Sequence, residues 1–177
     1  MSLGGIKMTE TLVTFFLDIF GRITSSEFGK CISIFILSML PIIELRGGLI
    51  AAALLKVSLF KAFLICFIGN ILPVPFILWF IRAILDWMRK KNTFNKIVKK
   101  IDKKVEDKKG QIEKYGFWGI VIFVGIPLPG TGAWTGALIA AMLDMNKKKA
   151  FLACALGVIM AGIIMALFSY GLLDLIF

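Results

Sequence analysis

GLIAAALLKVSLFKAFLICFIG, residues 48–69, aligns without a gap with GALIAAMLDMNKKKAFLACALG, residues 136–157. Ten of the 22 positions are identical, and the polar residues Lys61 and Lys149 fall in register. The same shift of 88 residues places Pro41 on Pro129. Biased apolar composition gives scattered matches but not a run of this kind with a lysine in register. The alignment therefore predicts that the chain consists of two related halves.

The composition predicts an all-α integral membrane protein. Of the 177 residues, 59% are hydrophobic, and the mean hydropathy is +0.90. Ala62 to Ile81 and Ala150 to Leu173 carry no charge, and about 20 apolar residues cross the ~30 Å core of a bilayer. We expect one membrane domain, residues 1–177, with four parts: an N-terminal interfacial helix (1–30, around the short apolar run 11–20), repeat one (31–85), a basic amphipathic connector (86–115) and repeat two (116–177).

Each half also contains an apolar run that is broken in its middle. In repeat two the sequence PLPGTG separates two limbs, residues 117–126 and 133–143. In repeat one PIIELR separates residues 31–40 from residues 47–55. Limbs of about ten residues reach about 15 Å, or half the apolar core. We therefore predict a re-entrant helical hairpin in each half, followed by one transmembrane helix.

Charge predicts how the halves are oriented. Residues 82–114 hold twelve Lys or Arg and five Asp or Glu, and basic segments beside a span mark the cytoplasmic side. Because this positive charge lies beside a predicted span, we expect its partner to be a membrane surface and not a nucleic acid. Apolar residues recur there at three- and four-residue spacing, which predicts an amphipathic helix on an anionic inner surface: Phe94, Ile97, Val98, Ile101, Val105 and Ile112.

The lysines at 147–149 test this orientation. If residues 144–149 share the cytoplasmic side with residues 82–114, the second broken run is a hairpin, and the second repeat is inserted upside down relative to the first. We expect this arrangement, an inverted repeat in a multi-pass protein of the plasma membrane. The alternative makes each broken run a single kinked span and places Lys147 to Lys149 outside.

The first tip carries the two ionisable residues that lie well inside an apolar stretch, Glu44 and Arg46. A charge at the membrane centre costs at least ~2.5 kcal/mol, so an intramembrane Glu and Arg form a functional-site hypothesis. In an extended tip both side chains point to one side. The structural alternatives are a mutually neutralised pair or a tip at the membrane interface.

The second tip, residues 125–132, has no charge. Its prolines stop the incoming limb, and its glycines allow the backbone to turn. The limbs that begin near Gly47 and Ala133 then direct free N–H groups toward the midplane, where they favour an anion. The substrate-binding residues that we predict are Glu44, Arg46, Gly47, Asn70, Pro127, Pro129, Gly130, Thr131, Gly132 and Trp134. Trp134 is equally compatible with a packing role. Asn70, Pro73 and Pro75 are predicted to interrupt the first span near its middle, either as cavity lining or as a packing kink.

Cofactor and metal chemistry is not expected. The chain has no His, and Cys31, Cys66 and Cys154 lie in apolar runs without a CxxC pair. We predict no catalytic residue, no metal and no cofactor, and the protein is not expected to be an enzyme.

The tips carry a family resemblance. ELRGG at 44–48 and PLPGTGAWTG at 127–136 resemble the signature stretches of the small multidrug export family, which is similar to the DedA superfamily. The resemblance covers roughly residues 34–170 and implies two opposed re-entrant hairpins. It also implies movement of lipid-linked phosphates or other phospholipids, often with proton coupling. Glu44 matches the acidic residue expected on the first hairpin. DedA members carry arginines on the second hairpin, and here Arg46 is expected to take over that anion-binding role.

These observations favour a transporter or flippase for an anionic, phosphate-bearing and lipid-linked substrate, and proton coupling is left open by the sequence. One alternative is a proton-coupled small multidrug exporter that uses Glu44, and another is a non-transporting membrane scaffold. The expected partners are an anionic lipid or small-molecule substrate and the bilayer, without nucleic acid. A homodimer is left open by the sequence.

Overall fold

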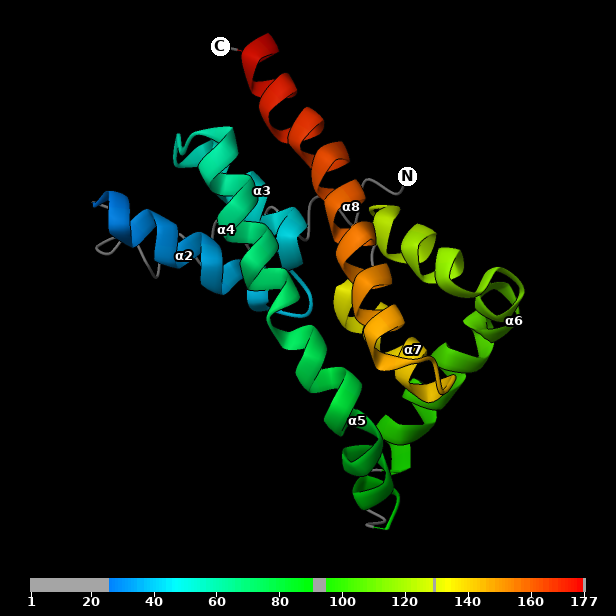
Figure 1. The fold of residues 1–177 in the computed structure, drawn as a ribbon. Helices are drawn as coiled ribbons and strands as arrows, with labels where there is room; N and C mark the ends of the chain where they lie inside the picture. The colour runs from blue at the N-terminus through cyan, green and yellow to red at the C-terminus, as the bar shows by residue number, and fades with distance from the viewer. Residues whose placement is uncertain (1–25, 91–94, 129, 177) are drawn as a thin grey trace.

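A computed structural model describes residues 26–90, 95–128 and 130–176 (Figure 1). Within these ranges the chain is all-helical, as predicted. The helices are α2 (Glu27–Met39), α3 (Glu44–Leu54), α4 (Leu59–Ile71), α5 (Pro73–Arg89), α6 (Asn95–Gly125), α7 (Ala133–Met142) and α8 (Lys147–Ile176). Most of the expected interfacial helix, residues 1–25, lies outside the described residues. The rest of that segment differs from the prediction, because α2 already begins at Glu27.

Two helical segments are long and apolar enough to cross a membrane, Leu59–Arg89 and Lys147–Gly171. The first contains the predicted span 62–81 and extends beyond it, and the second covers the predicted span 150–173 up to Gly171. The first is interrupted at Leu72, where α4 ends and α5 begins, although Leu72 keeps helical dihedral angles (φ −55°, ψ −42°). Pro73 and Pro75 have no N–H to donate to the preceding turn. The interruption of the first span that the sequence predicted is therefore present.

The outer surface of these segments is apolar. Phe60, Phe76 and Trp79 are 75%, 62% and 62% exposed, and Leu167 on α8 is 72% exposed. Exposed apolar area on this scale is unfavourable in water and normal against lipid. Together with the two spanning segments, it agrees with the membrane protein predicted from composition.

The remaining apolar helices are short. The long helix α6 divides at Gly116, whose dihedral angles (φ 53°, ψ −122°) a residue with a Cβ rarely adopts. Its second limb therefore runs from 117 to 125, and α7 has 10 residues. In the first half α2 has 13 residues and α3 has 11. Both halves thus contain two short helices joined by a tip, residues 40–43 (tip one) and residues 126–132 (tip two).

Tip one is shorter than the sequence predicted. The second limb, expected from Gly47, begins at Glu44. The reason is that Glu44 N–H donates to Leu40 O and Gly47 N–H to Ile43 O, which closes helical turns before Gly47. Glu44 and Arg46 therefore lie on the first turn of a helix and not in an extended tip, so that their side chains leave α3 in different directions.

The turns that follow α3 and α7 have the same backbone geometry at a separation of 88 residues. Lys56 and Asp144 both have left-handed dihedrals, with φ of 55° and 57°. Four backbone hydrogen bonds recur at this separation: Leu55 N to Ala51 O with Leu143 N to Ile139 O, Lys56 N to Ala53 O with Asp144 N to Ala141 O, Val57 N to Ala52 O with Met145 N to Ala140 O, and Ala62 N to Ser58 O with Ala150 N to Asn146 O.

The first short helix of each half, α2 and residues 117–125 of α6, has equivalent positions at a different separation in sequence. A Cβ on Gly69 would lie 2.7 Å from Phe35 O and 3.1 Å from the Cβ of Ser38. A Cβ on Gly157 would lie 2.9 Å from Val121 O and 2.6 Å from the Cβ of Val124. These equivalent contacts are 86 residues apart, whereas the closing turns are 88 apart, so two additional residues separate the equivalent positions on either side of tip two. The register that paired Pro41 with Pro129 does not extend into the first limbs.

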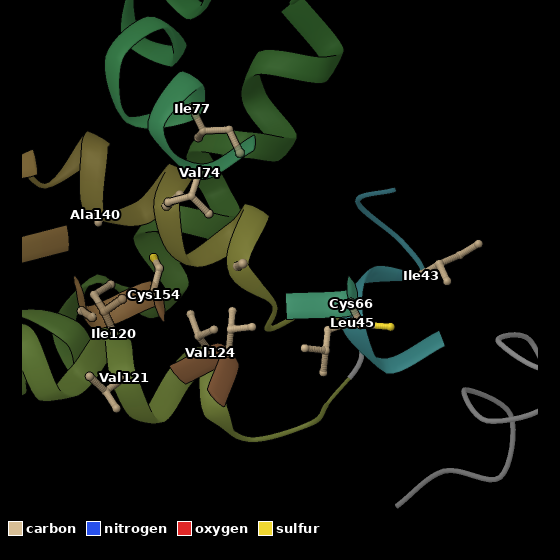
Figure 2. Packing of buried hydrophobic residues seen from close by; sticks show 14 of the residues in the cluster. Ile43, Leu45, Cys66, Val74, Ile77, Ile120, Val121, Val124, Ala140 and Cys154 are labelled. Atoms are coloured by element: carbon tan, nitrogen blue, oxygen red, sulfur yellow. The ribbon is translucent and has the colours of Figure 1, made fainter. Parts of the chain in front are cut away.

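The buried cluster draws on both halves. Figure 2 shows apolar side chains from α3, α4, α5, α6, α7 and α8 in it, among them Leu45, Cys66, Val74, Val124 and Cys154. Ala153, Gly157 and Ala161 on α8 follow one another at four-residue spacing and are all buried. Each span also packs against the other half, because α5 contacts α7 and α8 contacts α3.

The basic connector is helical from Asn95. Val98 and Val105 are only 4% and 5% exposed, so this part of the predicted apolar face is covered by protein. Arg89 on α5 pairs with Asp102 on α6 at 2.8 Å, which joins the end of the first span to the connector. Phe94 lies outside the described residues, and the cytoplasmic location of the connector stays a prediction.

Replacement of Lys56 by Gly tests the repeated turn. A left-handed conformation costs a residue with a Cβ ~1–2 kcal/mol, part of which glycine returns as backbone entropy. We expect Lys56→Gly to raise stability by about 0.5–1 kcal/mol, measured as the midpoint of thermal unfolding in detergent. Asp144→Gly is the matched control, and it should gain less because it also removes the ion pair with Arg82. A lower midpoint for Lys56→Gly would contradict the assigned turn geometry.

Candidate functional site

Arg46 connects the two tips. From the first turn of α3 its guanidinium donates to three oxygen atoms of tip two: Leu128 O, Ile126 O at 3.3 Å and Thr131 Oγ1 at 3.1 Å. These carbonyl groups follow the end of α6, where the helix no longer supplies donors. These carbonyl groups also accept from Leu128 N–H and Thr131 N–H within the tip, so the arginine of the first half adds donors that tie tip two to α3.

Thr131 organises tip two from inside. Its hydroxyl lies 2.8 Å from both Ile126 O and Leu128 O, and it accepts from Leu128 N–H at 3.3 Å. The same hydroxyl oxygen accepts from Arg46. The tip is thus closed by a single threonine, whose hydroxyl both donates and accepts, and by the arginine that reaches it from α3.

Glu44 faces the start of α7. Its side chain is buried, with only 6% of the residue exposed. The carboxylate packs directly on Gly132, the residue that caps α7, and a Cβ at Gly132 would overlap it. The N-terminus of a helix carries a partial positive charge that favours an anion. The first half of the chain thereby supplies the anion at the helix start in the second half.

The backbone at Glu44 is unusual. Its φ of 53° is left-handed, which is uncommon for a residue with a Cβ and costs about 1–3 kcal/mol. Strain of this kind persists where the surrounding structure holds the residue, often at functional sites. A buried ionisable side chain on a strained residue between two helix ends marks Glu44 as the centre of the candidate site.

Trp134 joins the site to an apolar groove. Its Nε1–H donates to Met39 O, the last residue of α2, at 3.1 Å. Beside this contact lies a groove of about 520 Å³ with an almost wholly apolar lining: Met39, Leu72, Pro73, Phe76, Ile77, Phe80, Ile81, Ile84 and Trp134. The interruption of the first span at Leu72 thus forms one wall of the groove.

The structure brings together five of the residues predicted from sequence: Glu44, Arg46, Thr131, Gly132 and Trp134. Gly47 is not a free donor, since its N–H is bound to Ile43 O. Pro127 is partly buried, and Gly130 is exposed with a φ of 82° that suits glycine. Pro129 lies outside the described residues.

Asn70 lies on α4 and is 3% exposed. Its Oδ1 is buried without a hydrogen-bond partner among the described residues.

Sequence reasoning predicted the role of Arg46 only in part. The prediction made it a ligand for a substrate anion, whereas its guanidinium donates to oxygen atoms of tip two. The partners that were missed are the carbonyl groups of Ile126 and Leu128, which accept from Arg46, and the carbonyl group of Met39, which accepts from Trp134. Backbone acceptors have no residue signature, so the only available signal was the general rule that carbonyl groups at helix ends require donors.

A comparison with known protein families gives one match. The family model described as "Putative small multi-drug export protein" matches residues 44–164, which is more than half of the chain. The match begins at Glu44 and includes tip two and most of α8. No curated protein and no solved structure matches the chain. The likeness to the DedA superfamily rests on the motifs alone.

A double-mutant cycle tests the contact between the tips. Gly132→Ala is expected to destabilise the protein by about 1–3 kcal/mol, because the added methyl group overlaps the Glu44 carboxylate. In a Glu44→Ala background the same change should cost much less, so the two effects should be non-additive by about 0.5–3 kcal/mol.

Thermal unfolding of the four proteins in detergent measures this coupling. Gly171→Ala is the control, since a Cβ at Gly171 meets nothing within 4 Å. Additive effects would show that Glu44 does not lie against Gly132.

Proposed function

The chain belongs to the family of putative small multi-drug export proteins, and from this premise we propose that it exports small amphipathic molecules across a membrane through the site between its two tips. The observation that carries the proposal is the contact of Glu44 with the N-terminus of α7. Because of this contact, the strength of the interaction between the two halves depends on whether the Glu44 side chain is ionised.

The proposed topology is an inverted repeat with two re-entrant hairpins. α7 has 10 residues, so it reaches about 15 Å, or half the ~30 Å apolar core. Asp144, two residues after α7, pairs with Arg82 near the end of the first span. Arg89 pairs with Asp102 of the connector at the same end. These pairs support a second hairpin that starts and ends on the side of the basic connector.

The first hairpin then enters from the opposite face. Its closing turn, residues 55–58, precedes the first residue of the span Leu59–Arg89, while Asp144 lies beside the last part of that span. A helical segment of 31 residues is about 46 Å long, which is enough for a whole bilayer with its headgroup regions. The recurrence of the turn geometry after 88 residues also supports two copies of one unit.

Proton coupling follows from the position of Glu44. The ionised carboxylate is stabilised beside the positive end of α7, and protonation removes that attraction. Loss of an interaction of ~1–2 kcal/mol changes the equilibrium between closed and open tips by roughly five- to thirtyfold. A proton arriving from one side therefore loosens the tips, and release of the proton tightens them again.

The proposed substrate has an apolar body and a positive charge. The apolar groove beside Trp134 suits the body. An ionised Glu44 suits the charge, and it already occupies the helix end that would otherwise attract an anion. The donors of Arg46 that reach tip two are bound to protein oxygen atoms.

A phosphate-bearing lipid is the second candidate. The observation in its favour is that an arginine and the N-terminus of α7 lie at the same junction, a combination that binds phosphate in other proteins. This reading requires Glu44 to be protonated when the phosphate enters, since two anions repel each other in an apolar medium. The two candidates therefore predict opposite effects of neutralising Glu44.

Transport in reconstituted vesicles distinguishes them. With a lipophilic fluorescent cation such as ethidium and an imposed proton gradient, Glu44→Gln is expected to reduce flux at least tenfold, whereas Glu44→Asp keeps part of it. With fluorescent phospholipid or polyprenyl phosphate as substrate, Glu44→Gln should retain flux, and Arg46→Lys should reduce it more than Glu44→Gln does. Equal cation flux in wild type and Glu44→Gln would reject the assigned role of Glu44, and flux of neither substrate would favour a scaffold.

Equivalent lysines of the two repeats test the topology. Lys61 and Lys149 are both exposed, and they occupy matching positions 88 residues apart. In a chain whose three cysteines are replaced by alanine, Lys61→Cys should react with a membrane-impermeant maleimide from outside intact cells. Lys149→Cys should react only after the cells are opened. Labelling of both positions from the same side would contradict the inverted repeat.

A further inference from the structure

Two contacts outside the site join each span to the closing turn of the other half. Arg82 on α5 pairs with Asp144, and its Nη2 donates to Met142 O at 3.1 Å. Tyr170 on α8 donates its hydroxyl to Val57 O at 2.8 Å. Positions 82 and 170 are 88 residues apart, the separation of the repeat. The two positions hold different residues, Arg and Tyr, yet each connects its span to the closing turn of the other half.

We infer that these contacts are the two gates of the transport pathway, Arg82 with Asp144 on the cytoplasmic side and Tyr170 with Val57 on the outer side. The inference rests on the proposed function, since a gate presupposes a pathway. Both residues are positioning residues, because neither touches the site at Glu44 and each acts by holding a turn.

The geometry places the contacts at opposite ends of the pathway. The turn that contains Val57 precedes the span Leu59–Arg89, and the turn that contains Asp144 lies beside the last residues of that span. Each turn continues directly from a short helix, α3 or α7, whose N-terminal end lies at the tips. A movement of either turn away from its span therefore carries a short helix, and one side of the tip contact, with it.

Both contacts are formed in this structure. In a transporter built from inverted repeats, the inward-open and outward-open states arise when one repeat rocks against the other around a fixed site. Opening toward the cytoplasm then separates Arg82 from Asp144 and leaves Tyr170 bound to Val57. Opening toward the exterior does the reverse.

The two gates differ in chemistry. The Arg82 and Asp144 side chains are 49% and 76% exposed, and an ion pair of this kind contributes no more than about 1 kcal/mol, which salt reduces further. The Tyr170 hydroxyl is partly buried and its bond is neutral, so its strength does not depend on salt. The inner gate is therefore expected to open more readily as the salt concentration rises, and the outer gate is not.

Side-specific labelling of the tip tests this inference without any substrate. The reporter is Leu128→Cys, an exposed position on tip two, in a chain whose native cysteines are replaced by alanine. A membrane-impermeant maleimide is added to vesicles of right-side-out or inside-out orientation, and the rate of labelling is measured. Arg82→Gln should raise the rate from the cytoplasmic side only, by about two- to fivefold. Tyr170→Phe should raise it from the outer side only, by about two- to tenfold.

Three further proteins complete the test. The double variant Arg82→Asp with Asp144→Arg should restore the low labelling rate. If Arg82→Gln inserts poorly into the membrane, Asp144→Asn replaces it and should raise the labelling rate from the cytoplasmic side in the same way. Arg89→Gln is the matched control, since Arg89 lies on the same helix but pairs with Asp86 and Asp102. Unchanged rates, or equal increases from both sides in both variants, would overturn the inference. The labelling rate is measured without any transport. If the wild-type protein transports no cation, that result therefore rejects the proposed function and leaves the labelling test of the two contacts valid.

Discussion

The carbonyl groups and N–H groups at the ends of a helix need partners outside that helix, and where water is excluded the protein must supply them. This constraint explains the connection between the halves. The carbonyl groups after α6 are met by Arg46, and the N-terminal end of α7 is met by Glu44. Both side chains come from the first turn of α3, so one helix of the first half completes two helix ends of the second. The two half-length hairpins therefore stabilise each other in pairs, and the chemistry of the site follows from the same contacts that hold the fold.

The duplication then accounts for the packing around the site. Each span contacts a short helix of the other half, α5 with α7 and α8 with α3, and each sends one polar side chain to the other half's closing turn. The recurrent hydrogen bonds fix the two closing turns, so the turns keep the symmetry of the repeat. The tips do not keep it, because two additional residues separate the equivalent positions on either side of tip two. The positions equivalent to Glu44 and Arg46 are Gly132 and Trp134, so both charged residues of the candidate site come from the first half.

Much of the fold could be predicted from the sequence, because its signals are local. Uncharged runs predicted the two spans, and the prolines predicted the interruption at Leu72. The PLPGTG segment predicted the start of α7 at Ala133. The start of α3 was misplaced by three residues, since the hydrogen bond from Glu44 N–H to Leu40 O depends on how tip one closes and has no side-chain signature. The charged residues of the site were found because charges are rare in apolar runs. The backbone acceptors of Arg46, and the contacts of Arg82 and Tyr170, join residues far apart in sequence and required coordinates.

The depth of Trp134 in the bilayer is the measurement that bears most directly on two tips meeting at the midplane. Trp134 lies at the start of α7, donates to Met39 O at the end of α2 and lines the groove, so its fluorescence reports on both tips. In a chain that keeps Trp134 as its single tryptophan, lipids with a nitroxide deep in the acyl chain should quench its emission more strongly than lipids labelled near the headgroup. Stronger quenching by the headgroup label, or by an aqueous quencher, would place the tips at the membrane surface and contradict a site at the centre of the bilayer.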